Sequence, residues 1–204
     1  MPYSSDHKAQ TRARIVDAAR RLFNRHGFEQ VSIDRIMLEA GLTRGGFYHH
    51  FGSKDELYAA AVASFTTCNP FRPEAAAIPP PAPMQLARML LDVYLCDEVF
   101  DNADHHCPLY ALPGDVARAG LSPQKAYTQL IRNLTAVYAG ALAGAPDGEQ
   151  RAQAIVALCV GGMVLARTTD DAALRASLRA AARRQALDLL DGPASRGRSL
   201  TRPA

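Results

Sequence analysis

Apolar residues recur at steps of three and four positions along most of the 204-residue chain, which is the period of an amphipathic helix. In the first such segment, residues 8–26, the apolar face carries Ile15, Ala18 and Leu22, and Gly27 is suited to the left-handed conformation that ends a helix. No stretch sustains the two-residue alternation of a strand with β-branched side chains. The pattern predicts an all-α protein.

Two short helices follow, separated by a turn of about three residues around Gly41. Ser32 is a suitable N-cap for the first of them, and Thr43 is expected to cap the second, over residues 43–50. A short turn with glycine between two such helices is typical of a helix-turn-helix, whose second helix enters the DNA major groove. The pattern therefore predicts a three-helix DNA-binding domain over residues 1–52.

A fourth helix is expected over residues 54–67, because Ser53 and Glu56 have the spacing of a capping box at its start. Six prolines then interrupt residues 69–83, which we expect to be a loop or linker.

Helical patterns resume after the prolines. Together with the fourth helix they form a second helical domain over residues 53–191, and the whole chain is expected to have about nine helices. Ser122 and Pro123 mark one helix start as a cap followed by proline. The last residues, 192–204, are rich in Gly, Pro, Ser and Arg, lack a helical period and are expected to form a mobile tail. The helices expected beyond the prolines cover 84–100, 109–119, 123–143, 148–168 and 171–190.

The net charge of +3 conceals an uneven distribution. Residues 1–54 carry a net charge of +4, residues 55–171 carry −6 and residues 172–204 carry +5. A basic N-terminal end is consistent with a polyanionic partner such as DNA. We expect the arginines of the C-terminal end to be solvated cover on a dimer.

The remaining composition is that of a globular protein, with 48% hydrophobic and 21% charged residues. The four cysteines form no Cys-x-x-Cys pair, so we expect free thiols and no metal or other cofactor. No window approaches 18 consecutive apolar residues, and the N-terminus lacks the order of a signal peptide. We therefore expect a cytoplasmic protein without a membrane partner.

Residues suited to DNA gather at the second helix of the helix-turn-helix. Arg44 has the fork geometry for a guanine edge or a phosphate, while Gly45 and Gly46 remove side chains where the backbone must come close to a partner. Two phenylalanines, Phe47 and Phe51, are expected to be core anchors. Donors suited to phosphate oxygens follow at Tyr48, His49 and Lys54.

Residues 8–58 resemble the TetR family of one-component transcriptional repressors. The resemblance implies three N-terminal helices that bind DNA, a fourth that connects, and five or more that form a ligand-binding and dimerisation domain. The stretches that carry it are Ile15-Val16-Asp17-Ala18-Ala19, Leu22-Phe23, Gly27-Phe28-Glu29, Val31-Ser32-Ile33-Asp34-Arg35-Ile36, Ala40-Gly41-Leu42-Thr43-Arg44-Gly45-Gly46-Phe47-Tyr48-His49-His50-Phe51 and Gly52-Ser53-Lys54-Asp55-Glu56-Leu57.

The resemblance also implies roles for single residues and partners. Arg44, Gly45 and Gly46 are expected to approach bases. The implied partners are a double-stranded DNA operator, a second copy bound through helices 148–168 and 171–190, and a small-molecule effector. The residues implied to touch phosphates are Ser32, Thr43, Tyr48, His49 and Lys54.

Cys107 opens an expected short helix, where the positive field of a helix N-terminus lowers the pKa of a thiol. The segment from Cys107 to Leu112 resembles a TetR subgroup that includes electrophile- and redox-responsive repressors. One hypothesis is a sensor thiol, and another is a buried, inert cysteine beside a non-covalent effector. The aromatic candidates for lining the effector pocket are Tyr94, Phe100, Tyr110 and Tyr127.

Two further alternatives remain open. A metal-responsive sensor could use His105, His106 and Cys107, although adjacent histidines point apart on a helix and no fourth ligand follows from the spacing. A helical enzyme that does not bind DNA is the other, but the chain has no nucleophile elbow, phosphate loop or His-Glu-x-x-His motif. The sequence therefore favours a regulator that is not an enzyme.

Overall fold

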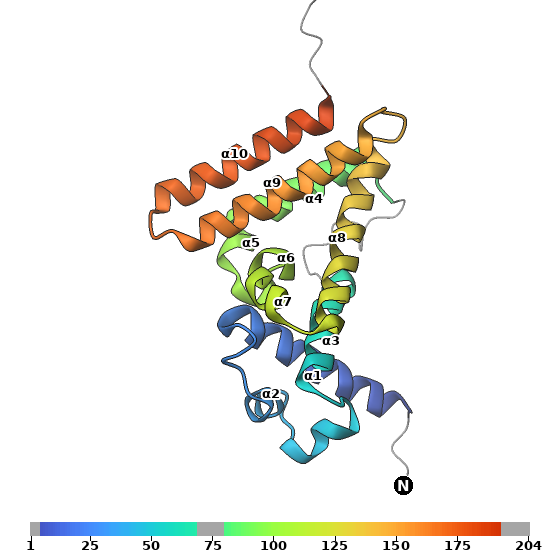
Figure 1. The fold of residues 1–204 in the computed structure, drawn as a ribbon, viewed down its shortest axis with the longest axis vertical. Coiled ribbons are helices and arrows are strands. Elements are labelled where there is room, and N and C mark those ends of the chain that lie inside the picture. The colour runs from blue at the N-terminus through green and yellow to red at the C-terminus, as the bar shows by residue number, and fades with distance from the viewer. Residues whose placement is uncertain (1–4, 69–79, 193–204) are drawn as a thin grey trace, which may run out of the picture.

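The computed structural model describes residues 5–68 and 80–192, and every regular element in these ranges is a helix (Figure 1). The all-α prediction is therefore confirmed. The expected tail and most of the expected proline-rich linker lie outside the described residues.

Three helices at one end of the molecule form a small unit that we call the head: α1 (Ser5–His26), α2 (Ile33–Glu39) and the 3-10 helix η1 (Arg44–His49) (Figure 1). Positive φ angles of 76° at Gly27 and 66° at Gly41 end α1 and α2 as expected. Phe47 and Phe51 are buried among the apolar residues of α1 and α2, so their expected core role is confirmed. The third helix is a 3-10 helix, and Thr43 lies at its N-cap position without a side-chain cap hydrogen bond, so the expected cap by Thr43 is wrong.

The helix α3 (Lys54–Cys68) leads out of the head. The Ser53 Oγ accepts the Glu56 amide at 3.1 Å, while the Glu56 carboxylate accepts the Gly52 amide at 2.7 Å, so the start of α3 is capped as the sequence predicts. An aromatic cluster joins α3 to α1, because the Tyr58 ring lies edge-on to Phe23 with centroids 5.1 Å apart.

Four long helices frame the second half of the chain: α4 (Pro83–Leu95), α8 (Leu121–Ala141), α9 (Gly148–Thr168) and α10 (Ala172–Asp191). The pair α9 and α10 lies side by side at the end of the molecule opposite the head, and α8 runs from the side of the head toward that end (Figure 1). Gly162 allows the close approach of α9 and α10, because a Cβ there would lie 2.7 Å from the Ala182 Cβ.

Two of the expected helices are divided, so the count of nine is too low. Pro113 has no amide hydrogen and restricts Leu112, which separates α6 (Pro108–Ala111) from α7 (Pro113–Arg118) within the expected helix 109–119. The expected helix 84–100 is divided at Cys96.

Cys96 has extended backbone, and its Sγ accepts the Val99 amide at 3.5 Å, which starts the short helix α5 (Asp97–Asp101). A one-turn 3-10 helix, η3 (Ala103–His105), follows. Ser122 does not cap α8, because that helix already begins at Leu121 with Gly120 in the N-cap position.

Two arginines of α10, Arg179 and Arg183, contact α4 and α5 of the same chain. Arg179 is buried, donates to the Leu95 carbonyl at 3.2 Å and to Asp97 at 2.5 Å, and lies over the Phe100 ring. Arg183 pairs with the Asp92 carboxylate through its Nε at 2.8 Å. The expectation of a solvated cover is wrong for Arg179, which is buried, whereas Arg183 remains exposed beside Asp92.

Within the described ranges one helix, α9, is long and apolar enough to cross a membrane by length and composition, with a mean hydropathy of 1.2. The core helix of a globular protein passes the same test, and 39% of this stretch is buried against its neighbours.

Candidate nucleic-acid interface

The surface of η1 carries most of the residues expected to contact DNA. Thr43, Arg44, Gly45, Tyr48 and His49 are all exposed on this face of the head. Tyr48 is 62% exposed although its ring packs edge-on against buried Phe47, with centroids 5.2 Å apart. An aromatic hydroxyl that stands out of the surface on a packed ring can donate a hydrogen bond to a phosphate.

Arg44 pairs with the Asp34 carboxylate of α2 at 2.8 Å. Both side chains are more than half exposed, so water and salt screen the pair, and an ion pair of this kind contributes at most about 1 kcal/mol. The guanidinium is therefore held close to the surface at little cost and can exchange Asp34 for a base edge or a phosphate. Ser32 caps α2, with its Oγ accepting the Arg35 amide at 3.2 Å, and keeps its hydroxyl proton for another acceptor.

The Lys54 side chain contacts Phe28 of the same chain, and the sequence did not indicate this contact. Its Nζ donates to the Phe28 carbonyl at 2.5 Å and lies 4.0 Å from the centre of the Phe28 ring. Partial burial lowers the pKa of this ammonium group. A phosphate contact by Lys54 remains a prediction, and it would require this tie to break.

Arg14 of α1 contacts the turn of the helix-turn-helix. Its Nη2 donates to the Ala40 carbonyl at 2.6 Å, and a Cβ on Gly41 would lie 3.1 Å from the same nitrogen. Sequence reasoning missed this residue because the helical period of α1 places arginines on a polar face without indicating their partners.

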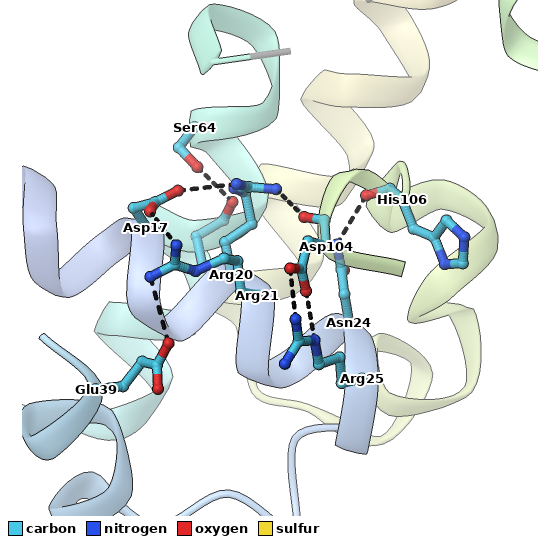
Figure 2. Close-up of polar contacts among 10 residues, drawn as sticks. Asp17, Arg20, Arg21, Asn24, Arg25, Glu39, Ser64, Asp104 and His106 are labelled. Atoms are coloured by element: carbon cyan, nitrogen blue, oxygen red, sulfur yellow. Dashed lines mark hydrogen bonds and ion pairs between the residues drawn. The ribbon is translucent and has the colours of Figure 1, made fainter. Parts of the chain in front are cut away.

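The C-terminal half of α1 is bound to the segment around η3, nearly 80 positions further along the chain (Figure 2). The Arg25 guanidinium donates twice to the Asp104 carboxylate, at 2.5 Å each. Arg20 is buried and donates to the Asp104 backbone carbonyl. Asn24 donates to the His106 carbonyl at 2.9 Å. Three side chains on consecutive turns of α1 therefore hold one short segment.

A second tie lies just beyond the end of α1. The Phe28 amide donates to the Asp115 carboxylate of α7 at 2.9 Å, and Arg118 pairs with the same carboxylate at 3.0 Å. Asp115 is only 17% exposed, which strengthens this charge-assisted bond relative to one in water. We call the contacts of residues 20–28 with residues 104–115 the junction.

Cys107 lies within segment 104–115 of the junction and is almost completely buried, with 2% of its surface exposed. Burial raises the pKa of its thiol to about 12, so the expected lowering of this pKa is wrong. The helix that Cys107 precedes has only four residues, and burial lowers the pKa values of His105 and His106, which removes the cationic neighbours the expectation needed.

The structure brings three of the expected effector residues together. Tyr94 and Tyr110 pack edge-on with ring centroids 5.5 Å apart, and both lie against Cys107. The cavity beside Tyr94 and Cys107 measures only about 20 Å³, which is room for one water molecule. Phe100 does not belong to this group, because its ring lies under the Arg179 guanidinium.

Tyr127 lines a larger cavity of about 250 Å³ between α8 and α9. Its hydroxyl donates to the Leu109 carbonyl at 2.7 Å, which connects the wall of this cavity to α6. No lining residue is charged. The others that line it are Ile131, Thr135, Gln153, Val156, Ala157 and Val160.

Across the described ranges, no group of three or more His, Cys, Asp and Glu side chains could hold a metal ion. The His106 Nε2 is instead 2.9 Å from the Phe100 carbonyl. The metal-responsive alternative therefore gains no site from the described residues.

Residues 15–61 match the model of a family described as bacterial regulatory proteins, tetR family. Over 57 residues the chain is 40% identical to an HTH-type transcriptional repressor of Mycobacterium tuberculosis. This match covers 28% of the chain and 30% of the repressor, so the chain aligns with less than a third of that relative's length.

The fold is similar to solved structures over most of the chain. The reduced form of NemR from Escherichia coli gives a TM-score of 0.69 at 17% identity and covers 85% of this chain and 95% of that one. A TetR-family transcriptional regulator from Streptomyces coelicolor gives a TM-score of 0.65 at 22% identity, over 90% and 95% of the two chains. At these identities the likeness shows the fold alone.

Proposed function

We propose that this chain, a member of the TetR family of bacterial regulatory proteins, is a dimeric DNA-binding repressor whose second helical domain binds a small-molecule effector. The observation that carries the proposal is the exposed set on η1, where Arg44, Tyr48 and His49 stand on a buried aromatic core. These side chains offer donors for base edges and phosphates in a helix-turn-helix that matches known repressors over its whole length.

Two copies would place two heads on one duplex, because a two-fold protein matches a two-fold operator. The outward faces of α9 and α10 suit this dimer. Leu165 and Leu174 are 55% and 45% exposed, and the Cβ position of Gly161 has no neighbour within 4 Å among the described residues. These apolar and small side chains would become buried in a helix pair that meets its two-fold copy.

The cavity between α8 and α9 is the candidate site for the effector. Its walls are mainly aliphatic and carry no charge, so a neutral and largely apolar molecule fits their chemistry. The hydroxyl and amide groups of Tyr127 and Gln153 could orient one polar group of such a molecule. Release by modification of Cys107 has less support, because that thiol is buried and its pKa is raised.

The junction supplies the mechanical connection between the two halves. Tyr127 joins the cavity wall to the Leu109 carbonyl, and the same short segment bears Asp104 and Asp115, which hold α1 and the loop after it. An effector that binds one arrangement of this segment better than another would shift the position of the head, and DNA affinity would fall by that difference in binding free energy.

The experiment is selection of duplexes from a randomised pool by the purified full chain, followed by affinity measurements on the winners. We expect an inverted repeat to be enriched and its affinity to fall steeply with salt. Arg44→Ala should weaken binding by roughly ten-fold or more and relax base preference, because one bidentate base contact contributes about 1–3 kcal/mol. Lys125→Ala, an exposed change of equal charge on α8, serves as the control.

An enzyme without a DNA partner predicts a different result. It would enrich no sequence, and the Arg44→Ala variant would bind the pool as the wild type does. That outcome would refute the proposed function.

A further inference from the structure

A hollow of about 540 Å³ lies in the head between the first part of α1 and the helix-turn-helix. Its polar lining residues come from both sides: His7, Lys8 and Thr11 from α1, and Thr43 and His49 from η1 and its N-cap. The α1 residues precede the stretch 15–61 that matches the family model, so that match assigns them no role.

The chemistry of the lining suits an anion. It contains an ammonium, imidazoles and hydroxyls, and none of its residues is acidic. Met37 and Leu42 contribute apolar surface. Gly46 also borders the hollow and has no side chain to fill it. A Cβ at this position would lie 3.6 Å from the Met37 methyl.

Several groups that carry positive charge lie close together around the hollow. Burial and then the positive charges of Lys8, His49 and Arg12 lower the pKa of His50, which also lines it. Arg12 lies over the Phe51 ring, 4.6 Å from its centre, and so remains next to this group. A bound anion would relieve the repulsion among these cations.

The position of the hollow identifies the source of the anion. Thr43, Gly46 and His49 belong both to its lining and to the face of η1 that the proposed function places on DNA. The sugar-phosphate backbone beside the occupied major groove is therefore the nearest source of phosphate.

We propose that this hollow binds one backbone phosphate of the duplex, with Lys8 of α1 as its cation and Thr43 and His49 as further donors. The inference rests on the proposed function and adds a contact from outside the helix-turn-helix. A phosphate contact fixes the register of the head on the duplex without reading sequence.

Salt dependence measures this contact directly. Each neutralised phosphate contributes about −0.9 to the slope of log affinity against log salt. In the full chain, Lys8→Gln should therefore reduce the slope by about 0.9 per protomer and weaken binding roughly five-fold per protomer at 0.15 M salt, with base preference unchanged. Lys8 is exposed, so the variant should fold as the wild type does, which circular dichroism checks.

Two further variants make the test specific. Lys8→Arg should retain the wild-type slope, and Lys125→Gln should leave it unchanged because that residue lies on α8. A Lys8→Gln slope equal to that of Lys125→Gln would overturn the inference while leaving the proposed function intact. If the wild type binds no duplex, the proposed function itself fails.

Inorganic phosphate is the second probe, because the same chemistry could serve a free anion. With a backbone phosphate as the ligand, millimolar phosphate should leave the imidazole proton resonances of His49 and His50 unshifted, and the selected duplex should shift them. Saturation by millimolar phosphate together with an unchanged Lys8→Gln slope would overturn the inference in favour of a free-anion site.

Discussion

The head and the second domain present their functional side chains in opposite ways. In the head, Arg44, Tyr48 and His49 are exposed on a closed aromatic core. In the second domain, Cys107 and Tyr110 are buried, and α9 and α10 expose the apolar side chains of Leu165 and Leu174. DNA contact requires charges and donors that are ready at the surface, whereas a ligand cavity and a dimer surface work by burying apolar area. The two halves therefore need different tests.

The largest effect that we expect is the low reactivity of the buried Cys107 thiol. Burial raises the pKa of this thiol to about 12, so very little of it is thiolate near neutral pH. We expect iodoacetamide to modify Cys107 in the native chain far more slowly than a model thiol, and to modify it readily in urea. The site of modification is read by mass spectrometry. Rapid native labelling would show that the second domain exposes a reactive group after all, and would revive the sensor hypothesis.

Two helical glycines provide the next test. Gly162→Ala places a Cβ 2.7 Å from the Ala182 Cβ and should lower the free energy of unfolding by about 1–3 kcal/mol. Gly140→Ala on α8 meets nothing within 4 Å among the described residues and should keep or raise stability through helix propensity, by up to about 1 kcal/mol. Urea denaturation checks both. Equal losses in the two variants would contradict the packing of α9 on α10.

Local features of the head could be predicted from the sequence because each depends on residues close together in the chain. Gly27 and Gly41 end their helices, Ser32 caps α2, and Phe47 is core, all as their positions indicate. The capping box at α3 needed only Ser53 and its neighbours.

The parts that sequence reasoning missed depend on partners far along the chain. Nothing local pairs Arg25 with Asp104 or directs Lys54 to the Phe28 carbonyl. The shift that the sequence predicts for the pKa of Cys107 has the wrong sign. Desolvation, which only the fold creates, raises this pKa by more than the field of a four-residue helix lowers it.

The next test asks whether the Asp115 contact of the junction holds the head in particular. Asp115→Ala leaves the Phe28 amide without its acceptor and should cost about 1–2 kcal/mol of unfolding free energy. The variant should also speed up hydrogen exchange of the head by more than it speeds up exchange of α9 and α10. Asp170→Ala, an exposed change of the same type, serves as the control. Exchange that rises equally in both halves would mean that Asp115 does not hold the head in particular.

The smallest expected effect is the pH dependence of stability. Burial lowers the pKa of His106 below its ordinary 6.5, so the unfolded chain binds more protons than the folded chain as the pH falls below that value. Stability should therefore decline as the pH falls through this range, and His106 alone should contribute less than about 1 kcal/mol of the loss between pH 7 and pH 6. His106→Gln, whose amide can still donate to the Phe100 carbonyl, should flatten this decline in part.

Partial flattening is expected because burial also lowers the pKa values of His50 and His105. Thermal unfolding across this pH range is the measurement. Stability of the wild type that rises on acidification would contradict the neutral, buried state of His106.

Hydrogen exchange of the full chain with and without a selected duplex locates the DNA-binding surface without assuming where it lies. We expect slower exchange on duplex binding in residues 32–50 and in the first turns of α1, with little change on the outward faces of α9 and α10. Protection concentrated in α9 and α10, or none in residues 32–50, would contradict this expectation.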